Sequence, residues 1–371
     1  MRIQYDLIQV GLGVMGLSAV EAATRRGLRT LGIEQFESPR HRFGSSHGPT
    51  RMIRQAYYED PRYVPLVRDA YQAWRNLEYW SGKDLLQEGG GLVAGGIGSE
   101  VTAGARRAAT IHGLPWWPVS SEELRGRYGI ALKPNSQALY ETHAGVIRAQ
   151  QAMEVLQQKS VMQGAHLQFE TRVLKISGGR GSFHVETSQG QEFTANHVIL
   201  TPGSWLPQWS GVPIRVEREP VFWFETESPP NVPVFLYEEG SILLYGFPYL
   251  PRLGLKVGVH HTGQYTTADG VDRHIHASEI EEMVSYIHRI FPDYRWRLRH
   301  AEVCLYTTTP DANFLIGQAG SGVVVGGGFS GHGFKFAPVL GELLVDSALS
   351  GENPPDYDLF WPSRFQWPQG Q

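Results

Sequence analysis

The one cysteine of the chain, Cys304, lies in a segment that could carry chemistry. Residues 299–310 alternate between apolar and polar side chains, which is typical of a β-strand. The alternation places the thiol on the polar face, together with His300, Glu302 and Tyr306. One cysteine cannot close a disulfide within the chain, so its uses are packing as a small apolar residue, metal binding or a covalent bond to another molecule. The segment alone leaves these three open.

A glycine-rich turn near the start of the chain has the spacing of a dinucleotide site. Residues 5–34 read as strand, turn, helix and strand, and the turn carries Gly11, Gly13 and Gly16. The first glycine permits a tight turn, the second lets a pyrophosphate approach the backbone, and the third lets helix and strand pack closely. Free N–H groups of the helix then face the phosphates. Glu34 ends the second strand, where a carboxylate can accept from a ribose hydroxyl. The motif does not choose between FAD and NAD.

Two arginines, Arg51 and Arg54, follow in a segment whose Gly, Ser and Pro content predicts a loop. If this segment makes a helical turn, positions i and i+3 place both arginines on one side. The alternative is a pair of solvated surface arginines. Because the loop follows the ribose-binding strand directly, the sequence favours arginines that lie over the cofactor, where a guanidinium can bind a substrate carboxylate bidentately.

A hairpin is predicted for residues 242–260. Along its second strand, Lys256, Gly258 and His260 share one face, and the glycine leaves room for a ligand to approach. Tyr245 lies on the first strand. If both faces look inward, Tyr245, Lys256 and His260 line one cavity. The alternative is an edge hairpin whose lysine and histidine lie in water.

The last motif is a strand, a glycine-rich loop and a helix. The loop holds Gly331 and Gly333, and the helix is expected from about residue 334 to 349. Its N-terminus would lie at the carboxyl end of a strand and direct partial positive charge into a crevice. Lys335 adds a cation there. Such an end would stabilise the negative charge of a reduced flavin, although a plain strand–helix unit is the alternative.

Composition excludes several classes of protein. A net charge of −4 gives no basic surface for nucleic acid, and no polybasic cluster suggests binding to a membrane surface. No apolar run approaches the roughly 20 residues that span a bilayer. The chain opens on a predicted strand without the features of a secretory signal, and one cysteine suits a reducing compartment. We therefore expect a soluble cytoplasmic protein.

Five motifs resemble those of monomeric sarcosine oxidase and N-methyltryptophan oxidase, which are FAD-dependent amine oxidoreductases of the D-amino acid oxidase-like superfamily. In chain order they are GSSHGPTRMIR (44–54), YGFP (245–248), GLKVGVH (254–260), VCLYT (303–307) and GFSGHGFKF (328–336). The likeness runs from residue 5 to the closing segment 363–366, nearly the whole chain. The GHGFK element with its matched cysteine is specific, whereas the glycine fingerprint is not.

For the cofactor, the resemblance implies one FAD per chain, bonded through its 8α carbon to Cys304. His47 and Arg51 would lie against the flavin face opposite the substrate. Gly331 and Gly333 would complete the flavin site, and no metal is expected.

For the substrate, the resemblance implies that Arg54 and Lys335 hold its carboxylate. Lys256 would sit near flavin N5 and activate oxygen, since its ammonium offsets the charge that develops there. The reaction would be hydride transfer from a secondary amine's C–H to flavin N5, hydrolysis of the resulting imine, and release of hydrogen peroxide when oxygen reoxidises the flavin. The implied catalytic residues are Lys256, His260, Tyr245 and Arg51.

The predicted fold is α/β (α+β overall), with a Rossmann-type FAD-binding domain interleaved with an antiparallel-sheet substrate domain. The FAD-binding domain would take residues 1–80, 141–213 and 315–371, and the substrate domain 81–140 and 214–314. The predicted partners are a small amino acid and O₂, with neither nucleic acid nor membrane, and the resemblance implies a monomer.

Three positions depart from the family pattern, in which a histidine often precedes His47, an aspartate follows Gly48 and a histidine follows Arg54. Here Ser46, Pro49 and Gln55 stand instead. These changes bear on the flavin environment and the substrate preference rather than on the class of reaction.

Three functions remain open. The first is an FAD-dependent oxidase of N-methyl or cyclic secondary amino acids, and the second is a dehydrogenase of the same fold that passes electrons to a quinone or carrier protein. The third is a flavin-binding scaffold without turnover. Lys256 favours the oxidase, and the carboxylate clamp disfavours the scaffold, which needs none. Sarcosine, a bulkier N-methyl amino acid and an Amadori-type amine all remain open as substrates.

Overall fold

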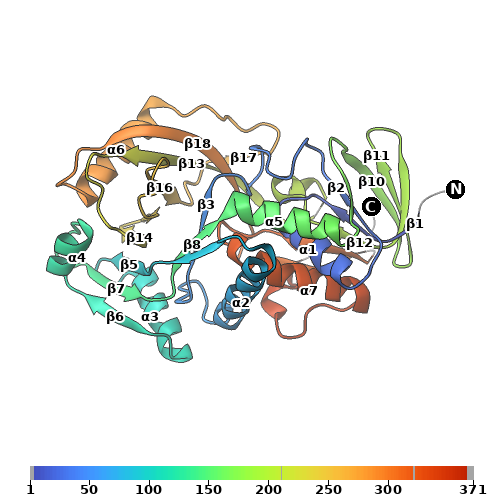
Figure 1. Ribbon diagram of the computed structural model, residues 1–371, viewed down its shortest axis with the longest axis horizontal. Coiled ribbons are helices and arrows are strands. Elements are labelled where there is room, and N and C mark those ends of the chain that lie inside the picture. Colours follow the sequence, from blue (N-terminus) through green and yellow to red (C-terminus); the bar gives the residue numbers. More distant parts are fainter. Residues whose placement is uncertain (1–3, 210, 321, 366–371) are drawn as a thin grey trace.

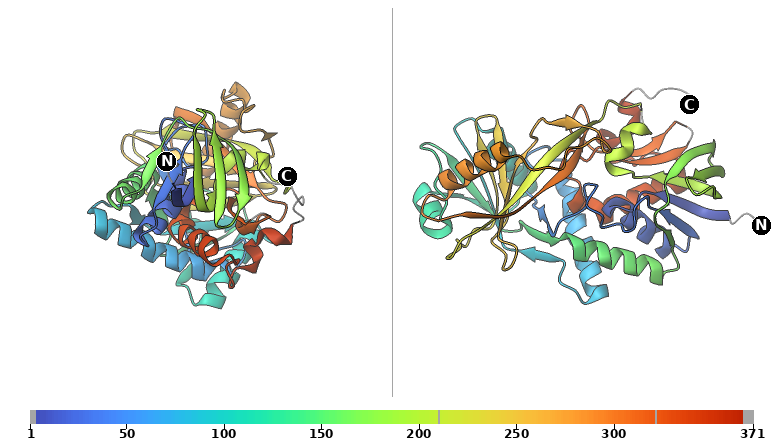
Figure 2. Two further views of the ribbon diagram at one scale, coloured as in Figure 1. Left: turned by 90° about the vertical axis from the view of Figure 1, so that its right-hand side faces the viewer. Right: turned by 90° about the horizontal axis from the view of Figure 1, so that it is seen from above.

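The computed structural model describes residues 4–209, 211–320 and 322–365. Figure 1 shows an elongated molecule with a large sheet towards each end and helices around them. The views in Figure 2 place the second sheet at the far end from the first. Among the described residues, no helix is both long enough and apolar enough to cross a membrane.

The first sheet has the parallel core expected of a Rossmann-type domain. Strand β1 pairs in parallel with β2 on one side and β12 on the other, and β2 with β9 and β12 with β20 continue the parallel set. Antiparallel pairs of β10 with β11, β11 with β12 and β19 with β20 extend it. The strands are β1 (Gln4–Val10), β2 (Thr30–Ile33), β9 (His166–Gln168), β10 (Val173–Gly179), β11 (Ser182–Thr187), β12 (Glu192–Leu200), β19 (Leu315–Ala319) and β20 (Val323–Gly327).

Helix α1 (Val14–Arg25) packs between α5 (Ala149–Met162) and α7 (Ala337–Ser350), and α2 (Tyr63–Ser81) also contacts α7. Small residues let these helices approach, since nearly every residue of α1 is buried. The predicted carboxy-terminal helix is confirmed, although residues 334–336 form a 3₁₀ turn ahead of α7.

The second sheet is antiparallel except for the parallel pairing of β14 with β5. Its order is β17-β13-β16-β15-β14-β5-β7-β6, with β18 along β13. The predicted hairpin is therefore central in this sheet and not at its edge. The strands are β5 (Gly91–Gly95), β6 (Trp116–Val119), β7 (Gln137–Glu141), β13 (Arg215–Glu225), β14 (Val234–Glu239), β15 (Ile242–Gly246), β16 (Leu255–His260), β17 (Tyr265–Thr266) and β18 (Arg297–Thr308), with helices α3 (Glu100–His112), α4 (Ser121–Tyr128) and α6 (Ala277–Ile290).

A small third sheet corrects one prediction. Arg51 does not lie on a helical turn, because β3 (Thr50–Ile53) pairs with β8 (Gly145–Arg148), which also pairs with β4 (Leu86–Glu88). Arg54 directly follows the strand. Backbone pairing with β8 overrides the local preference of a loop-like sequence for a turn.

The predicted fold class is confirmed by the parallel first sheet and the mostly antiparallel second sheet. The two-domain division stays a prediction. The third sheet crosses its boundaries, since β4 falls in the predicted substrate domain while β3 and β8 fall in the predicted FAD-binding domain. Residues 1–3, 210, 321 and 366–371 of the predicted FAD-binding segments lie outside the described part of the chain.

Replacing Gly16 with alanine should destabilise the fold. A Cβ atom there would collide with the carbonyl oxygen of Gly11, a backbone atom that cannot move aside. It would also come within 3.0 Å of Thr201 Oγ1. Overpacking of this kind costs about 1–3 kcal/mol, so the urea midpoint should fall. Gly126→Ala is the matched control, because this exposed helical glycine has no neighbour within 4 Å of an added Cβ. That variant should be as stable as the parent or more stable by about 0.5–1 kcal/mol; equal midpoints for both variants would contradict the close approach.

Candidate active site

A cavity of about 420 Å³ lies where the first sheet, the third sheet and the long strands of the second sheet meet. Among the predicted site residues, Gly16 does not line it, because Gly16 packs behind Gly11. The predicted residues that line the cavity are Gly11, Gly13, Glu34, His47, Arg51, Arg54, Tyr245, Lys256, His260, Cys304, Gly331, Gly333 and Lys335.

One end of the cavity is formed by the glycine turn and the start of α1. Glu34 is buried, and its carboxylate accepts from the backbone N–H groups of Leu12 at 2.8 Å and Phe36 at 3.2 Å. Burial raises the pKa of Glu34, and the backbone N–H groups oppose this. Ser46 Oγ accepts from the Val14 N–H at 3.1 Å, so this departure from the family pattern places a hydroxyl at the N-terminus of α1. The sequence did not predict that contact.

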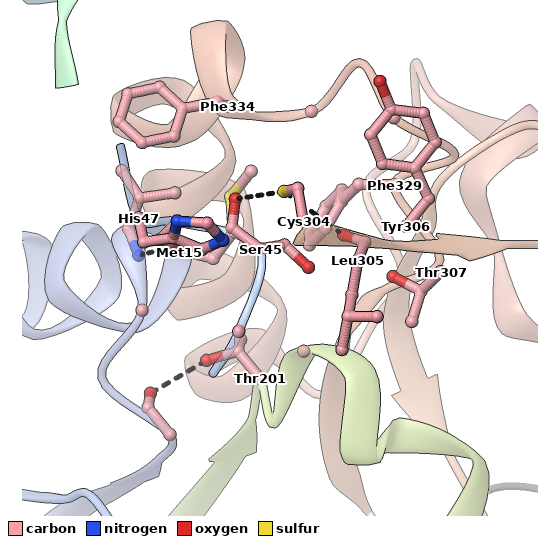
Figure 3. Close-up of a pocket in the computed structure, with 18 of the residues that line it drawn as sticks. Met15, Ser45, His47, Thr201, Cys304, Leu305, Tyr306, Thr307, Phe329 and Phe334 are labelled. Atoms are coloured by element: carbon pink, nitrogen blue, oxygen red, sulfur yellow. Dashed lines mark hydrogen bonds between the residues drawn. The ribbon is translucent and has the colours of Figure 1, made fainter. Parts of the chain in front are cut away.

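Cys304 lies on β18 in the middle of the cavity wall. Its thiol lies 3.9 Å from the carbonyl oxygen of Ser45, and Figure 3 shows the sulfur directed towards that loop. Burial alone would raise the pKa of the Cys304 thiol, but the positive charges of His47, Arg51 and Lys256 lower it to about 7. The thiol therefore faces cations and a cavity, which is the environment of a reactive cysteine and not of an inert core residue.

His47 lowers the pKa of Cys304 more than the other two cations do. Burial alone would lower the pKa of His47, but Cys304 and Glu302 raise it to about 9. Its Nδ1 lies 3.4 Å from Glu302 Oε1, an ion-pair distance without the geometry of a hydrogen bond. Within the described part of the chain, neither ring nitrogen has a hydrogen-bond partner although both are buried. Buried donors of this kind are expected to meet a ligand.

Arg51 fixes the loop that carries His47. Its guanidinium donates to the carbonyl oxygens of Thr50 at 2.8 Å and Ser45 at 2.7 Å, and also to that of His47. The same group stacks over the ring of Phe334. Arg51 thus ties the segment before β3 to the loop ahead of α7.

The hairpin contributes Lys256, His260 and Tyr245, as predicted. Lys256 donates to the Thr50 carbonyl oxygen at 3.2 Å, and its ammonium lies over the rings of Phe247 and Trp223. Burial, assisted by the charge of Arg51, lowers the pKa of Lys256 to about 7.

The other two hairpin side chains are neutral at pH 7. Burial lowers the pKa of His260 well below its usual value, and its Nδ1 lies 3.4 Å from the Tyr306 hydroxyl. Burial also raises the pKa of Tyr245. Together they give the cavity a wall of uncharged rings with polar tips.

Arg54 and Lys335 meet at the far side of this wall, but Arg54 is already paired. Its guanidinium donates to both oxygens of Glu59, at 2.7 and 2.6 Å, and lies over the rings of Tyr57 and Tyr58. Glu59 was not predicted from the sequence, although a carboxylate five residues after an arginine is a possible ion-pair partner. A bound carboxylate must therefore share or displace this partner.

Among the described residues, no carboxylate forms an ion pair or hydrogen bond with Lys335. Its ammonium donates to the His332 carbonyl oxygen at 2.7 Å and lies 3.4 Å from the Tyr57 hydroxyl. Burial, followed by the charge of Arg54, lowers the pKa of Lys335 to about 7. An anionic ligand beside both cations would raise that pKa again and be held by the restored charge.

Outside the cavity, Glu217, Glu219 and His261 approach closely enough to hold a metal ion. His261 Nδ1 lies 3.1 Å from Glu217 Oε2, and the Thr262 N–H donates to Glu219 at 3.2 Å. Burial raises the pKa of Glu219 well above its usual value. A carboxyl whose pKa is raised holds its proton more readily and is a weaker metal ligand than an ionised one.

Comparisons with known proteins show the family to which the chain belongs. The model of the FAD dependent oxidoreductase family matches residues 6–347. A monomeric sarcosine oxidase from Streptomyces avermitilis is 36% identical and aligns over 97% of each chain. An N-methyl-L-tryptophan oxidase from Yersinia pestis is 31% identical over 98% of this chain and 100% of its own. Among solved structures, NikD, an unusual amino acid oxidase essential for nikkomycin biosynthesis, has the same fold, with a TM-score of 0.85 over 97% of each chain at 19% identity.

The resemblance drawn from the five motifs is thereby confirmed at the level of the family. The match extends over nearly the whole chain and includes the glycine turn at Gly11, the loop before Arg54 and the segment around Cys304. The chain belongs to the FAD dependent oxidoreductase family, and its relatives there are monomeric sarcosine oxidases and N-methyl-L-tryptophan oxidases.

Proposed function

We propose that this protein is an FAD-dependent oxidase of secondary amino acids, such as sarcosine or another N-methyl or cyclic amino acid, that uses O₂ and releases hydrogen peroxide. The observation that carries the proposal is the convergence of Arg54, Lys335 and Lys256 on one cavity beside Cys304. A buried cluster of cations is costly without anions to meet. An amino acid carboxylate, a reduced flavin and reduced oxygen are the anions of this reaction.

FAD fits the residues of the cavity. It would place its pyrophosphate at the N-terminus of α1, a ribose at Glu34 and its ring system beside Cys304. The Nε2 of His47, which has no hydrogen-bond partner among the described residues, offers it a hydrogen bond. When bound, FAD supplies a hydride acceptor for the amine's C–H and passes the electrons on to oxygen. Covalent attachment at Cys304 is part of the proposal.

The chain's own groups would bind and orient the substrate. Lys335 and Arg54 hold the carboxylate, with Glu59 offsetting one of the two charges until the ligand arrives. Tyr245, His260 and the rings around them exclude water from the amine end. Because His260 is neutral at pH 7, it adds no charge that would repel a protonated amine.

A dehydrogenase of the same fold is the second candidate. Lys256 argues for the oxidase, since a buried ammonium over two aromatic rings is placed to stabilise negative charge on oxygen. Anaerobic titration with sarcosine, N-methyl amino acids, proline and pipecolate separates the candidates. An oxidase or a dehydrogenase bleaches with its substrate, whereas a flavin-binding scaffold bleaches with none, and rapid recolouring in air identifies the oxidase.

Lys256→Met should slow reoxidation by oxygen and leave anaerobic reduction by the amino acid nearly unchanged. Stopped-flow absorbance measures both half-reactions separately. The exposed Lys175, whose side chain is 64% exposed, provides the control Lys175→Met, which should alter neither rate. Normal reoxidation of the Lys256 variant would remove this lysine from the oxygen site.

Protein precipitated with acid should stay yellow, because a thioether to Cys304 survives denaturation. Cys304→Ser should instead release its flavin into the supernatant, since a serine hydroxyl is a far weaker nucleophile than a thiolate. Absorbance of pellet and supernatant at the flavin maximum is the measurement. Free flavin in the supernatant of the unaltered protein would show that the bond does not form.

Affinity for a non-oxidisable carboxylate such as acetate should fall as the pH rises through about 7. Lys335 has a pKa lowered to about 7, so its ammonium is present below that pH and lost above it. Loss of a required proton weakens binding by up to about tenfold per pH unit, while Arg54 stays charged throughout. Flavin difference spectra from pH 6 to 9 give the dissociation constant. Lys335→Met should bind weakly with little pH dependence; an unchanged slope in that variant would assign the titration to another group.

A further inference from the structure

Glu302 occupies the cavity wall next to the cysteine without a role in the reaction described above. It precedes Cys304 by two positions on β18, so both side chains leave the same face of the strand. One carboxylate oxygen lies 3.4 Å from His47 Nδ1, and the other lies 3.7 Å from His300 Nε2. Glu302 therefore connects the strand that carries the thiol to the loop that carries the imidazole.

The backbone beside His47 is shaped for this carboxylate. Gly48 has a φ of +87°, and a Cβ atom there would come within 3.3 Å of Glu302 Oε1 and 3.5 Å of Arg51 Nη1. A side chain at position 48 would be strained in that conformation and would crowd both groups. The glycine thus leaves room for both Glu302 and Arg51 beside the loop.

The charges around the thiol come from every element that packs against it. His47 and Arg51 face it from the loop before β3 and from β3 itself, Lys256 from β16 and Arg273 from the segment after β17. Glu219 and Tyr245 approach from β13 and β15, Tyr306 lies on β18, and burial raises the pKa of all three groups. Of these groups, His47 contacts both Cys304 and Glu302. An imidazolium next to a thiol favours the thiolate, and a carboxylate next to the imidazole favours the imidazolium.

We propose that Glu302 is a positioning residue for covalent attachment of FAD, which holds His47 charged and oriented so that Cys304 is a thiolate when the flavin arrives. The inference rests on the proposed function, because it assumes that FAD is the group attached. Glu302 acts through His47 and need not touch the cofactor.

The attachment balances with oxygen as the oxidant. The thiolate sulfur bonds to the flavin's 8-methyl carbon, that methyl loses a proton, and the electron pair of its broken C–H bond remains in the flavin ring system. Dioxygen then takes two electrons and, with the thiol proton and the methyl proton, leaves as hydrogen peroxide. In sum, one thiol, one methyl group and one O₂ give one thioether and one H₂O₂. Glu302 and His47 contribute to the step that makes the sulfur nucleophilic.

The test follows covalent incorporation over time. Full-length chain from riboflavin-starved cells is mixed with FAD in air, and flavin fluorescence of the denatured protein band measures the bond. We expect Glu302→Gln to move the pH–rate profile upward by about one unit. Because the pKa of Cys304 is about 7, this shift slows incorporation about fivefold at pH 7 and about tenfold at lower pH, where the thiol is mostly protonated in both proteins. The rate should recover above pH 8.5. Glu302→Asp should lie between the two, and the exposed Glu186→Gln should match the parent.

A second measurement needs no flavin at all. Because the chain has one cysteine, the pH dependence of alkylation by iodoacetamide reports Cys304 alone. The profile of Glu302→Gln should shift upward by about one unit, and Glu302→Asp should restore part of the shift. This readout also serves if the glutamine variant binds FAD poorly, since dissociation of non-covalent FAD is measured separately by fluorescence quenching.

The outcomes separate this inference from the proposed function. If the parent forms the covalent bond and Glu302→Gln forms it at the same rate from pH 6 to 9, the role of Glu302 is wrong and the oxidase stands. If the parent oxidises sarcosine or another amine with FAD that acid releases, the covalent bond is absent and the inference falls with it. An alkylation profile that is identical in parent and Glu302→Gln also overturns it.

Discussion

The cavity depends on how buried positive charge is balanced. Arg51, Arg54, Lys256 and Lys335 come from three separate stretches of sequence and line one cavity. The two lysines have lost part of their basicity, whereas Arg54 keeps its charge by pairing with Glu59. Burying these charges costs desolvation free energy unless anions pair with them. In the proposed amino acid oxidation, the substrate carboxylate, the reduced flavin and reduced oxygen are the anions that these cations would stabilise.

The rest of the fold holds these cations at fixed places. The parallel sheet ends at the glycine turn and the loop ahead of α7, while β15, β16 and β18 carry the lysine, the cysteine and the uncharged rings. The third sheet has only three strands among the described residues, but it sets the position of Arg51, which holds the loop with His47. Backbone carbonyl oxygens from that loop receive Arg51 and Lys256, so the loop and the cations hold each other.

Two carboxylates, Glu59 and Glu302, lie beside cationic side chains in the site. Glu59 pairs with Arg54, one member of the proposed carboxylate clamp, and Glu302 lies beside His47, next to the thiol. Of the departures from the family pattern, only Ser46 has a side-chain contact with described residues at the cofactor end, where it accepts from the start of α1. At Gln55 the contact is the backbone N–H, which donates to Glu141. Nothing in the structure links Pro49 to substrate choice; its carbonyl oxygen accepts from Ala149.

Local pattern was enough to predict the strand–turn–helix at Gly11, the hairpin with Lys256 and the polar face of Cys304, because each depends on a period of two or on glycine spacing within one segment. Whether the hairpin faces a cavity or lies at an edge was left open by the sequence, and its central place in the sheet decided it. The helical turn considered for Arg51 was wrong, since β8, which is distant in the sequence, supplies the hydrogen bonds that fix the backbone there. The pairing of Arg54 with Glu59 and of His47 with Glu302 was also beyond the sequence. Such ion pairs depend on which side chains burial brings together, and burial is settled only when distant segments pack. Sequence determined which residues could do chemistry, and tertiary structure decided their partners and hence their charges.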